Sequence, residues 1–197
     1  MHYDSKSISE FIKKSSNTIL ELNKKIDEIE KISACLCNTF ISGNKILTCG
    51  NGGSAADAQH FAAEMLIRFR QDNDRISLPA IALTQDVSTL TACANDYSFE
   101  EIYSRLVSSL GNKGDTLFAI STSGRSQNIL KAMETAKQKE LNIILLTGQR
   151  KTTMDDFSNF TIHVNDTNTA RIQQAHITLI HSIMYLTEYK LAKENFL

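Results

Sequence analysis

Two side chains able to move protons lie one helical turn apart, just beyond a glycine-rich stretch. The stretch is Cys49–Ser54 (C-G-N-G-G-S), and His60 and Glu64 follow it. Residues four apart project from one face of a helix. Imidazoles and carboxylates are the usual general acids and bases near neutral pH. The spacing predicts acid–base chemistry beside a ligand of the glycine stretch; the alternative is a surface His–Glu pair beyond a tight turn.

The glycine stretch has the pattern of an anion-binding turn. It follows the short apolar run 45–48 and precedes an alanine-rich segment with helical spacing, which predicts a strand, a turn and a helix. Glycine permits positive φ and close backbone approach, and the free N–H groups of a helix start favour phosphate. Ser54 is the expected N-cap of this helix. The stretch matches neither G-x-G-x-x-G nor Walker A.

A second candidate phosphate site is the hydroxyl-rich stretch 121–126. It follows an apolar run and precedes a helical pattern, and four of its six residues carry hydroxyl groups. Neutral hydroxyls and free helix N–H groups hold a phosphate monoester without a lysine or a metal. Ordinary turn chemistry is the alternative, because Ser and Thr are common in turns.

The last helical segment carries further polar groups, Gln173, His176 and His181. Gln173 and His181 are eight residues apart and therefore lie about 80° apart around a helix axis. A single histidine on an apolar helix is usually a hydrogen-bonded core residue. Two histidines on one helix, together with a His–Glu pair elsewhere, favour a functional site.

The elements that must position these groups are five apolar runs alternating with helical patterns. The runs are 45–49, 78–83, 116–120, 142–146 and 160–164. Buried strands separated by helices predict an α/β fold with a five-stranded parallel sheet, doubly wound and flavodoxin-like. Ligands bind beyond the carboxyl ends of such strands. That rule selects the glycine stretch, the stretch 84–86 and the hydroxyl-rich stretch.

Residues 6–41 form a long helical pattern ahead of the sheet. About 35 helical residues would extend for about 50 Å, more than a small domain covers. We therefore expect residues 1–42 to form a helical oligomerisation segment joined to residues 43–197 in one structural unit, with a second copy of the chain as partner. The alternative is a helix pair folded against its own sheet.

Composition restricts the class of protein. The chain has 197 residues, 42% apolar and 22% charged, which favours one folded domain over disorder. A formal charge of -1 gives no basic excess for nucleic acid. The four cysteines have no paired-ligand spacing, which favours reduced thiols in a cytoplasmic protein. No signal peptide and no membrane-spanning run is recognisable.

Taken together, these motifs resemble the SIS (sugar isomerase) domain family, and within it the phosphoheptose isomerases. The matching pieces are C-G-N-G-G-S-A-A-D-A-Q-H-F-A-A-E at 49–64, A-N-D at 94–96, I-S-T-S-G-R-S at 120–126 and A-R-I-Q at 170–173, with His181. They occur in the family's order and span most of the chain beyond residue 42.

The resemblance implies a homotetramer that interconverts sedoheptulose 7-phosphate and D-glycero-D-manno-heptose 7-phosphate. This is the first committed step toward the ADP-heptose of bacterial lipopolysaccharide or capsule.

The resemblance also implies roles for individual residues. Glu64 and His181 match the acid–base pair, and the site is expected between subunits. The expected phosphate-binding residues are Ser121, Thr122, Ser123 and Ser126. The residues expected to line the sugar are Asn51, Gly52, Gly53, Glu64, Asn95, Asp96 and Gln173. One Zn²⁺ per subunit is expected to be bound by His60, Glu64, Gln173 and His181. A metal-bound Glu64 is not free to act as the base, so base, ligand or both stay open.

Three departures from the family pattern bear on substrate affinity. Gln174 replaces the usual glutamate of R-I-Q-E, residues 149–153 replace a glycine-rich loop, and Arg125 replaces a small polar residue beside the phosphate loop. The alternative function is a non-catalytic SIS binding protein resembling the replication-initiator-associating protein. That relative lacks the groups that this chain keeps at Glu64 and His181.

Overall fold

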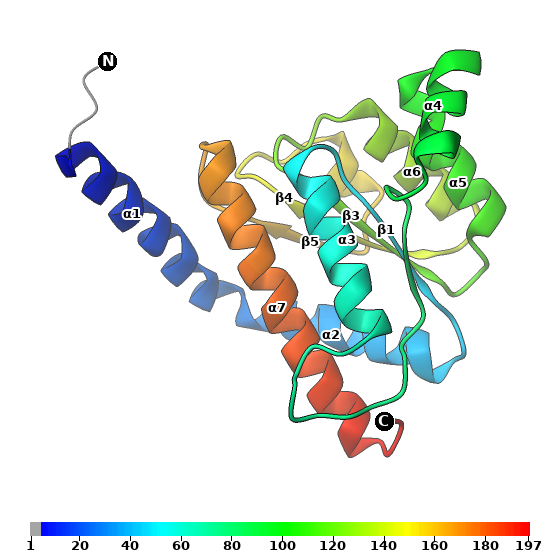
Figure 1. Cartoon of the computed structure of the whole chain (residues 1–197), viewed down its shortest axis with the longest axis horizontal. Helices are drawn as coiled ribbons and strands as arrows, with labels where there is room; N and C mark the ends of the chain where they lie inside the picture. Colours follow the sequence, from blue (N-terminus) through cyan, green and yellow to red (C-terminus); the bar gives the residue numbers. More distant parts are fainter. Residues whose placement is uncertain (1–4) are drawn as a thin grey trace.

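The computed structural model describes residues 5–197 as a parallel sheet with helices on both faces (Figure 1). The strands are β1 Ile46–Cys49, β2 Ala80–Ala82, β3 Thr116–Ser121, β4 Asn142–Thr147 and β5 Phe160–His163. The helices are α1 Ser5–Leu20, α2 Ile26–Ile41, α3 Gly53–Leu66, α4 Val87–Asp96, α5 Ile102–Leu110, α6 Gln127–Gln138 and α7 Thr169–Lys193. Short 3-10 turns occupy Glu21–Lys25, Phe99–Glu101 and Thr153–Asp156.

The sheet confirms the predicted fold class. Its five strands are all parallel in the order β2-β1-β3-β4-β5, which is the flavodoxin-like order. All five strands lie within the predicted runs or extend one residue beyond them. β2 is shorter than the run 78–83, but backbone bonds to β1 continue past both of its ends: the Ile46 N–H donates to the Pro79 carbonyl oxygen at 3.0 Å, and the Leu83 N–H donates to the Thr48 carbonyl oxygen at 2.9 Å. Pro79 has no N–H to donate and is tolerated here on an edge strand.

Alternation along the strands gives the sheet two separate cores. Phe118 and Ile144 point to the face covered by α2, α3 and α7, where Phe118 stacks on Phe61 with ring centroids 4.6 Å apart. Leu117 and Leu145 point to the other face, which α5 and α6 cover. Successive side chains of a strand face opposite sides, so these continuous apolar runs bury both faces.

The two N-terminal helices differ: α2 packs on its own chain, as the alternative expectation holds, whereas α1 leaves apolar side chains exposed. α2 packs against α7, and Ile32 and Leu36 belong to the same core as the sheet, so this half folds on its own chain. α1 contacts α7 through buried Ser15 and Thr18, while Ile8 and Ile12 are 57% and 58% exposed. The predicted segment 1–42 also includes residues 1–4, which lie outside the described residues. Among residues 5–197 no helix is long and apolar enough to cross a bilayer.

α3 ends earlier than the sequence pattern indicated. The helical pattern predicts a helix to about Arg70, whereas α3 ends at Leu66. The Arg75 side chain returns to the helix end and donates to the carbonyl oxygens of Glu64 and Met65 at 2.7 and 2.9 Å. These last carbonyls have no partner within the helix, so a guanidinium that satisfies them favours ending the helix there.

Asp166 joins α1 to the start of α7. Its carboxylate accepts bonds from the Arg171 guanidinium at 2.6 and 2.7 Å and from the Thr18 hydroxyl at 2.7 Å. These bonds, with the Arg171 contact foremost, hold the pKa of Asp166 well below its usual range. A carboxylate with a lowered folded-state pKa stabilises the fold above its unfolded-state pKa of about 4 and loses that contribution as the pH falls.

Asp166→Asn should therefore lower the free energy of unfolding at pH 7 by about 1.5–3 kcal/mol, the usual contribution of hydrogen bonds to a charged group. The loss of stability between pH 5 and pH 2 should become shallower, because one carboxylate with a lowered pKa is gone. Urea denaturation across this pH range measures both effects. Glu10→Gln, on the exposed surface of α1, is the control. Equal acid limbs in Asp166→Asn and the control would contradict the assignment.

Candidate active site

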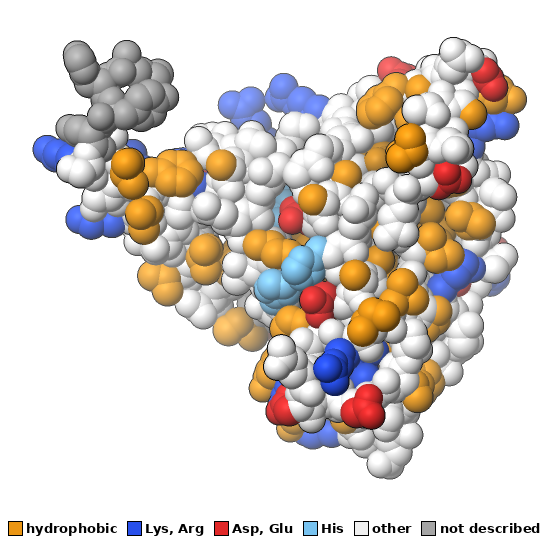
Figure 2. All heavy atoms as spheres, viewed as in Figure 1, with side chains coloured by type: hydrophobic (Ala, Val, Ile, Leu, Met, Phe, Trp, Pro, Cys, Tyr) orange, Lys and Arg blue, Asp and Glu red, His pale blue; other side chains and the backbone are white. Residues whose placement is uncertain are grey.

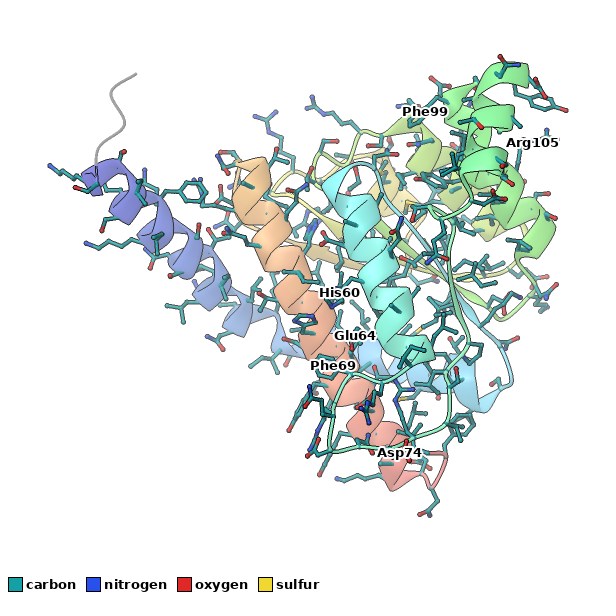
Figure 3. All side chains as sticks on the ribbon, viewed as in Figure 1. His60, Glu64, Phe69, Asp74, Phe99 and Arg105 are labelled. Atoms are coloured by element: carbon teal, nitrogen blue, oxygen red, sulfur yellow. The ribbon has the colours of Figure 1, made fainter. Side chains whose placement is uncertain are left out.

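The two histidines and the glutamate singled out in the sequence converge between α3 and α7. Nε2 of His181 lies 3.1 Å from Nε2 of His60, and Nε2 of His60 lies 3.5 Å from Oε1 of Glu64. α3 and α7 run side by side in the same direction (Figure 1), and Figure 3 shows His60 and Glu64 on the α7 side of α3. Figure 2 shows a histidine patch on the surface there. One chain therefore brings both acid–base candidates together.

The cluster is half-buried, and this affects its charge. The side chains of His60 and Glu64 are 44% and 27% exposed. Burial, followed by the repulsion of His60, lowers the pKa of His181, while Glu64 acts weakly in the other direction. His181 is therefore predominantly neutral at pH 7, and one ring nitrogen of a neutral imidazole is free to accept a proton.

Gln173 lies at the other end of the α3–α7 contact. A Cβ added to Gly53 would stand 2.3 Å from its Nε2, so the Gln173 amide lies directly against Gly53. His60 follows Gly53 by seven residues, a rise of about 10 Å along α3. Within this chain Gln173 therefore lies beside the glycine turn, and the other three members of the predicted zinc set lie together two turns away.

The three converging side chains suit zinc in their chemistry. Two imidazoles and a carboxylate with an open fourth position are a known catalytic ligand set. A tetrahedral ion with Zn–N bonds of about 2.0–2.1 Å separates its nitrogens by about 3.3 Å, close to the 3.1 Å between His60 and His181. The side chains nevertheless contact each other directly. In the described chain no group of three or more His, Cys, Asp or Glu has the spacing of a formed metal site.

The glycine turn is held in place by two contacts that the sequence analysis did not identify. Asn51 and Asn128 exchange a pair of amide hydrogen bonds of 2.8 and 2.9 Å, which joins the turn to the first turn of α6. The buried Tyr103 hydroxyl donates to the Gly50 carbonyl at 2.6 Å, and burial raises the pKa of that phenol. Asn128 lies two residues after the hydroxyl-rich stretch, and its place at a predicted helix start was the available signal in the sequence.

The predicted cap of α3 is wrong. Gly52, with φ +57°, is the N-cap residue, and Ser54 lies inside the helix with its side chain buried. A Cβ on Gly50 would stand 2.3 Å from the Ser54 carbonyl oxygen, so the turn is too tight for a side chain there. The helix therefore begins without a side-chain cap, and the N–H groups of Ser54 and Ala55 donate to the carbonyl oxygens of Asn51 and Gly52 at 3.0 Å.

The hydroxyl-rich stretch lies at the carboxyl end of β3, as predicted. Ser126 is the N-cap residue of α6, and Ser121 accepts a bond from the Gly124 N–H at 3.2 Å. Thr122 and Ser123 line a cavity of about 240 Å³ together with Arg125 and Arg150, which contribute positive charge, and Asp166, whose carboxylate is paired with Arg171. Hydroxyls, a helix start and two cations form a suitable environment for an anion.

Two predicted sugar-site residues lie elsewhere. Asn95 and Asp96 are exposed at the carboxyl end of α4, where the Asn95 amide donates to Asp96 at 2.8 Å. Figure 1 shows α4 far from α7. His176 is a core residue: it is fully buried, its Nε2 lies 3.3 Å from the Thr147 carbonyl oxygen, and burial lowers its pKa to about 4. A single chain thus gathers only part of the predicted site.

Comparison with known proteins places this geometry in a family. The SIS domain family matches residues 10–148. A phosphoheptose isomerase from Alteromonas mediterranea is 49% identical over 160 residues, which are 80% of each chain. The chain belongs to the phosphoheptose isomerase family of SIS-domain proteins. The non-catalytic alternative is not favoured, because the curated relatives bear the isomerase name.

Solved structures of this family share the fold over nearly the whole chain. A phosphoheptose isomerase from Neisseria gonorrhoeae is 36% identical and covers 93% of this chain and 98% of its own, with a TM-score of 0.87. The corresponding protein from Francisella tularensis is 34% identical and covers 95% and 100%, with a TM-score of 0.90. The sheet order and the helices that carry the site are therefore those of the family.

Asn128→Ala should loosen the glycine turn, because it removes both amide bonds and leaves the Asn51 side chain without its partner. We expect the free energy of unfolding to fall by about 1–3 kcal/mol. Urea denaturation measures the change, and Gln138→Ala on the exposed end of the same helix is the control. If both variants unfolded at the wild-type urea concentration, the amide pair would not hold the turn.

Proposed function

We propose that the chain interconverts sedoheptulose 7-phosphate and D-glycero-D-manno-heptose 7-phosphate in the cytoplasm, toward the ADP-heptose of lipopolysaccharide or capsule. The observation that carries this proposal is the convergence of His60, Glu64 and His181 in a member of the phosphoheptose isomerase family. The aldose–ketose reaction needs a base for a carbon-bound proton and an acid beside two oxygens. A carboxylate next to a neutral imidazole supplies both.

The reaction proceeds through an enediol. From the ketose, Glu64 removes a proton from C1 while the C2 carbonyl oxygen gains one, and the C1–C2 double bond forms. Glu64 then returns the proton to C2, and the C1 hydroxyl loses its proton to become the aldehyde. His181 acts at the two oxygens, and the numbers of protons and electrons balance without an oxidant. Well-placed proton transfer of this kind contributes about 10²–10⁴-fold.

The phosphate binds at the other end of the site. The groups proposed to hold it are Ser121, Thr122, Ser123 and Ser126 with the amides of the α6 start. Arg125 and Arg150 line the adjoining cavity and attract the anion. Asn51, Gly52, Gly53 and Gln173 are the sugar-binding groups that this chain supplies beside the glycine turn.

A zinc ion is proposed to be held by His60, Glu64 and His181. The fourth family ligand, Gln173, lies two turns away within one chain, so we propose that a neighbouring copy supplies it. When bound, zinc supplies a positive charge that polarises the substrate oxygens. Glu64 is either a ligand or the base at a given moment.

Glu64→Gln should abolish isomerisation of sedoheptulose 7-phosphate in protein supplied with zinc, because an amide does not take up a proton from carbon. Binding of the sugar phosphate, measured by calorimetry, should stay within a few-fold of wild type. Glu140→Gln, at an exposed glutamate between α6 and the amino end of β4, opposite the carboxyl edge of the sheet, is the control. Normal turnover by Glu64→Gln would remove this residue from the mechanism.

The active assembly is proposed to be a homotetramer. In support, α1 leaves Ile8, Phe11 and Ile12 exposed, and Asn95 and Asp96 are exposed on α4, which Figure 1 shows away from α7. A neighbouring copy is proposed to supply these two residues and to cover α1.

Light scattering of the purified protein should therefore give the mass of four chains. Phe11→Asp should yield smaller species with reduced turnover, because it places a charge in an apolar contact. Lys6→Asp, at an exposed position on the same helix, should stay tetrameric. A monomeric wild type with full activity would contradict the proposal.

A further inference from the structure

A buried ion pair lies directly below the proposed acid–base cluster. Nε of Arg75 lies 2.5 Å from Oε1 of Glu188, and the two side chains are 0% and 2% exposed. Glu188 follows His181 by seven residues on α7, which places it two turns further along nearly the same face. The pair therefore lies against the helix that carries His181.

Arg75 also binds the end of α3, the helix that carries Glu64. Its Nη2 donates to the Glu64 carbonyl oxygen at 2.7 Å, and its Nη1 donates to the Met65 carbonyl oxygen at 2.9 Å. A cation at a helix carboxyl end is also favoured by the helix dipole. One guanidinium thus connects the backbone of Glu64 to α7 through a direct chain of short bonds.

Glu188 binds the backbone of Phe69, whose ring lies against the imidazole of His181. Oε1 of Glu188 accepts from the Phe69 backbone N–H at 3.3 Å, and Oε2 accepts from the Asn73 amide at 3.3 Å. The Phe69 ring lies 5.5 Å from the His181 ring at an interplanar angle of 35°. Figure 3 shows Phe69 just below His60 and Glu64. The Phe69 ring therefore packs beside the His181 imidazole.

Fold stability alone does not account for this arrangement. A buried ion pair is often no more stabilising than two apolar side chains of similar volume, because both charges lose their hydration. An apolar pair would not form directional hydrogen bonds. Arg75 and Glu188 form such bonds to the Glu64 carbonyl at the end of α3 and to the Phe69 backbone N–H beside α7. The remaining bonds of the pair, from Arg75 to the Ile76 carbonyl oxygen at 2.9 Å and from the Asn73 amide to Glu188, hold the loop between α3 and β2.

We propose that Arg75 and Glu188 are positioning residues that set the separation and orientation of Glu64 and His181. This inference rests on the proposed isomerase function for its kinetic readout. The pair fixes the end of α3 relative to α7 and places the Phe69 ring on His181. Neither residue touches substrate.

The decisive variant is the double replacement Arg75→Met/Glu188→Met. It removes the directional bonds and leaves an apolar contact of similar volume, so the fold is retained. We expect kcat for sedoheptulose 7-phosphate to fall about 10²-fold, since small displacements of reacting groups have effects of that size. KM should change less than threefold, because the phosphate-binding loops lie at the other end of the site. Asp72→Asn, which breaks the exposed Arg70–Asp72 pair of the same loop, should leave both constants unchanged.

A spectroscopic readout separates positioning from general damage. In protein labelled with ¹³C at histidine Cε1, the His181 resonance carries the ring-current shift of Phe69, which Phe69→Leu identifies by its loss. The double variant should lose most of this shift, whereas His163, whose contacts are with Asp155 and Gly148, should keep its resonance. Unchanged kcat together with an unchanged His181 resonance in the double variant would overturn the proposal.

Two further results keep the test decisive. Should the double variant not unfold cooperatively, Glu188→Gln takes its place: it keeps an acceptor for the Phe69 amide but weakens the bond to Arg75, so kcat should fall and the ring-current shift should persist. No fall in kcat there would overturn the proposal. A wild-type protein without isomerase activity would refute the proposed function, and the His181 resonance would then decide the positioning role by itself.

Discussion

Helix α7 packs against α2 on one side and α3 on the other, and the rotation of this helix decides whether a site exists at all. Ile180, Ile183 and Leu191 are fully buried in the core below the sheet. From α2, Ser33 and Cys37 donate to the carbonyl oxygens of Ile183 and Thr187. With its apolar face held in this way, α7 has one edge left beside α3, and that edge carries Gln173 and His181. A rotation by one residue would turn the imidazole away from Glu64.

The phosphate end of the site depends on a different constraint, the common edge formed by the carboxyl ends of parallel strands. β1 and β3 are hydrogen-bonded neighbours, so the glycine turn and the hydroxyl-rich stretch that follow them emerge side by side. The Asn51–Asn128 pair then joins the two loops across this edge. Rigid strands and a direct amide contact together give a flexible glycine turn one conformation.

The face of the sheet that each helix covers also explains which predicted site residues lie apart. α3 and α7 lie on one face of the sheet and bring their polar edges together, whereas α4 belongs to the other half of the molecule. Asn95 and Asp96 share the carboxyl end of α4, which lies away from the α3–α7 contact in this chain. Ile8 and Ile12 of α1 are likewise left exposed by the part of the chain that the structure describes, residues 5–197.

The sequence by itself determined the sheet, the two loops at its carboxyl edge and the types of residue in the site, because these follow from short-range pattern. Five apolar runs and the His60–Glu64 spacing are local properties of the chain. Only the tertiary structure decided that His181 reaches His60, that Gln173 instead lies on Gly53, and that Asn128, Arg75 and Glu188 hold the site. Each of these contacts joins residues more than seventy positions apart. They depend on the rotation and relative height of packed helices, which no local pattern encodes.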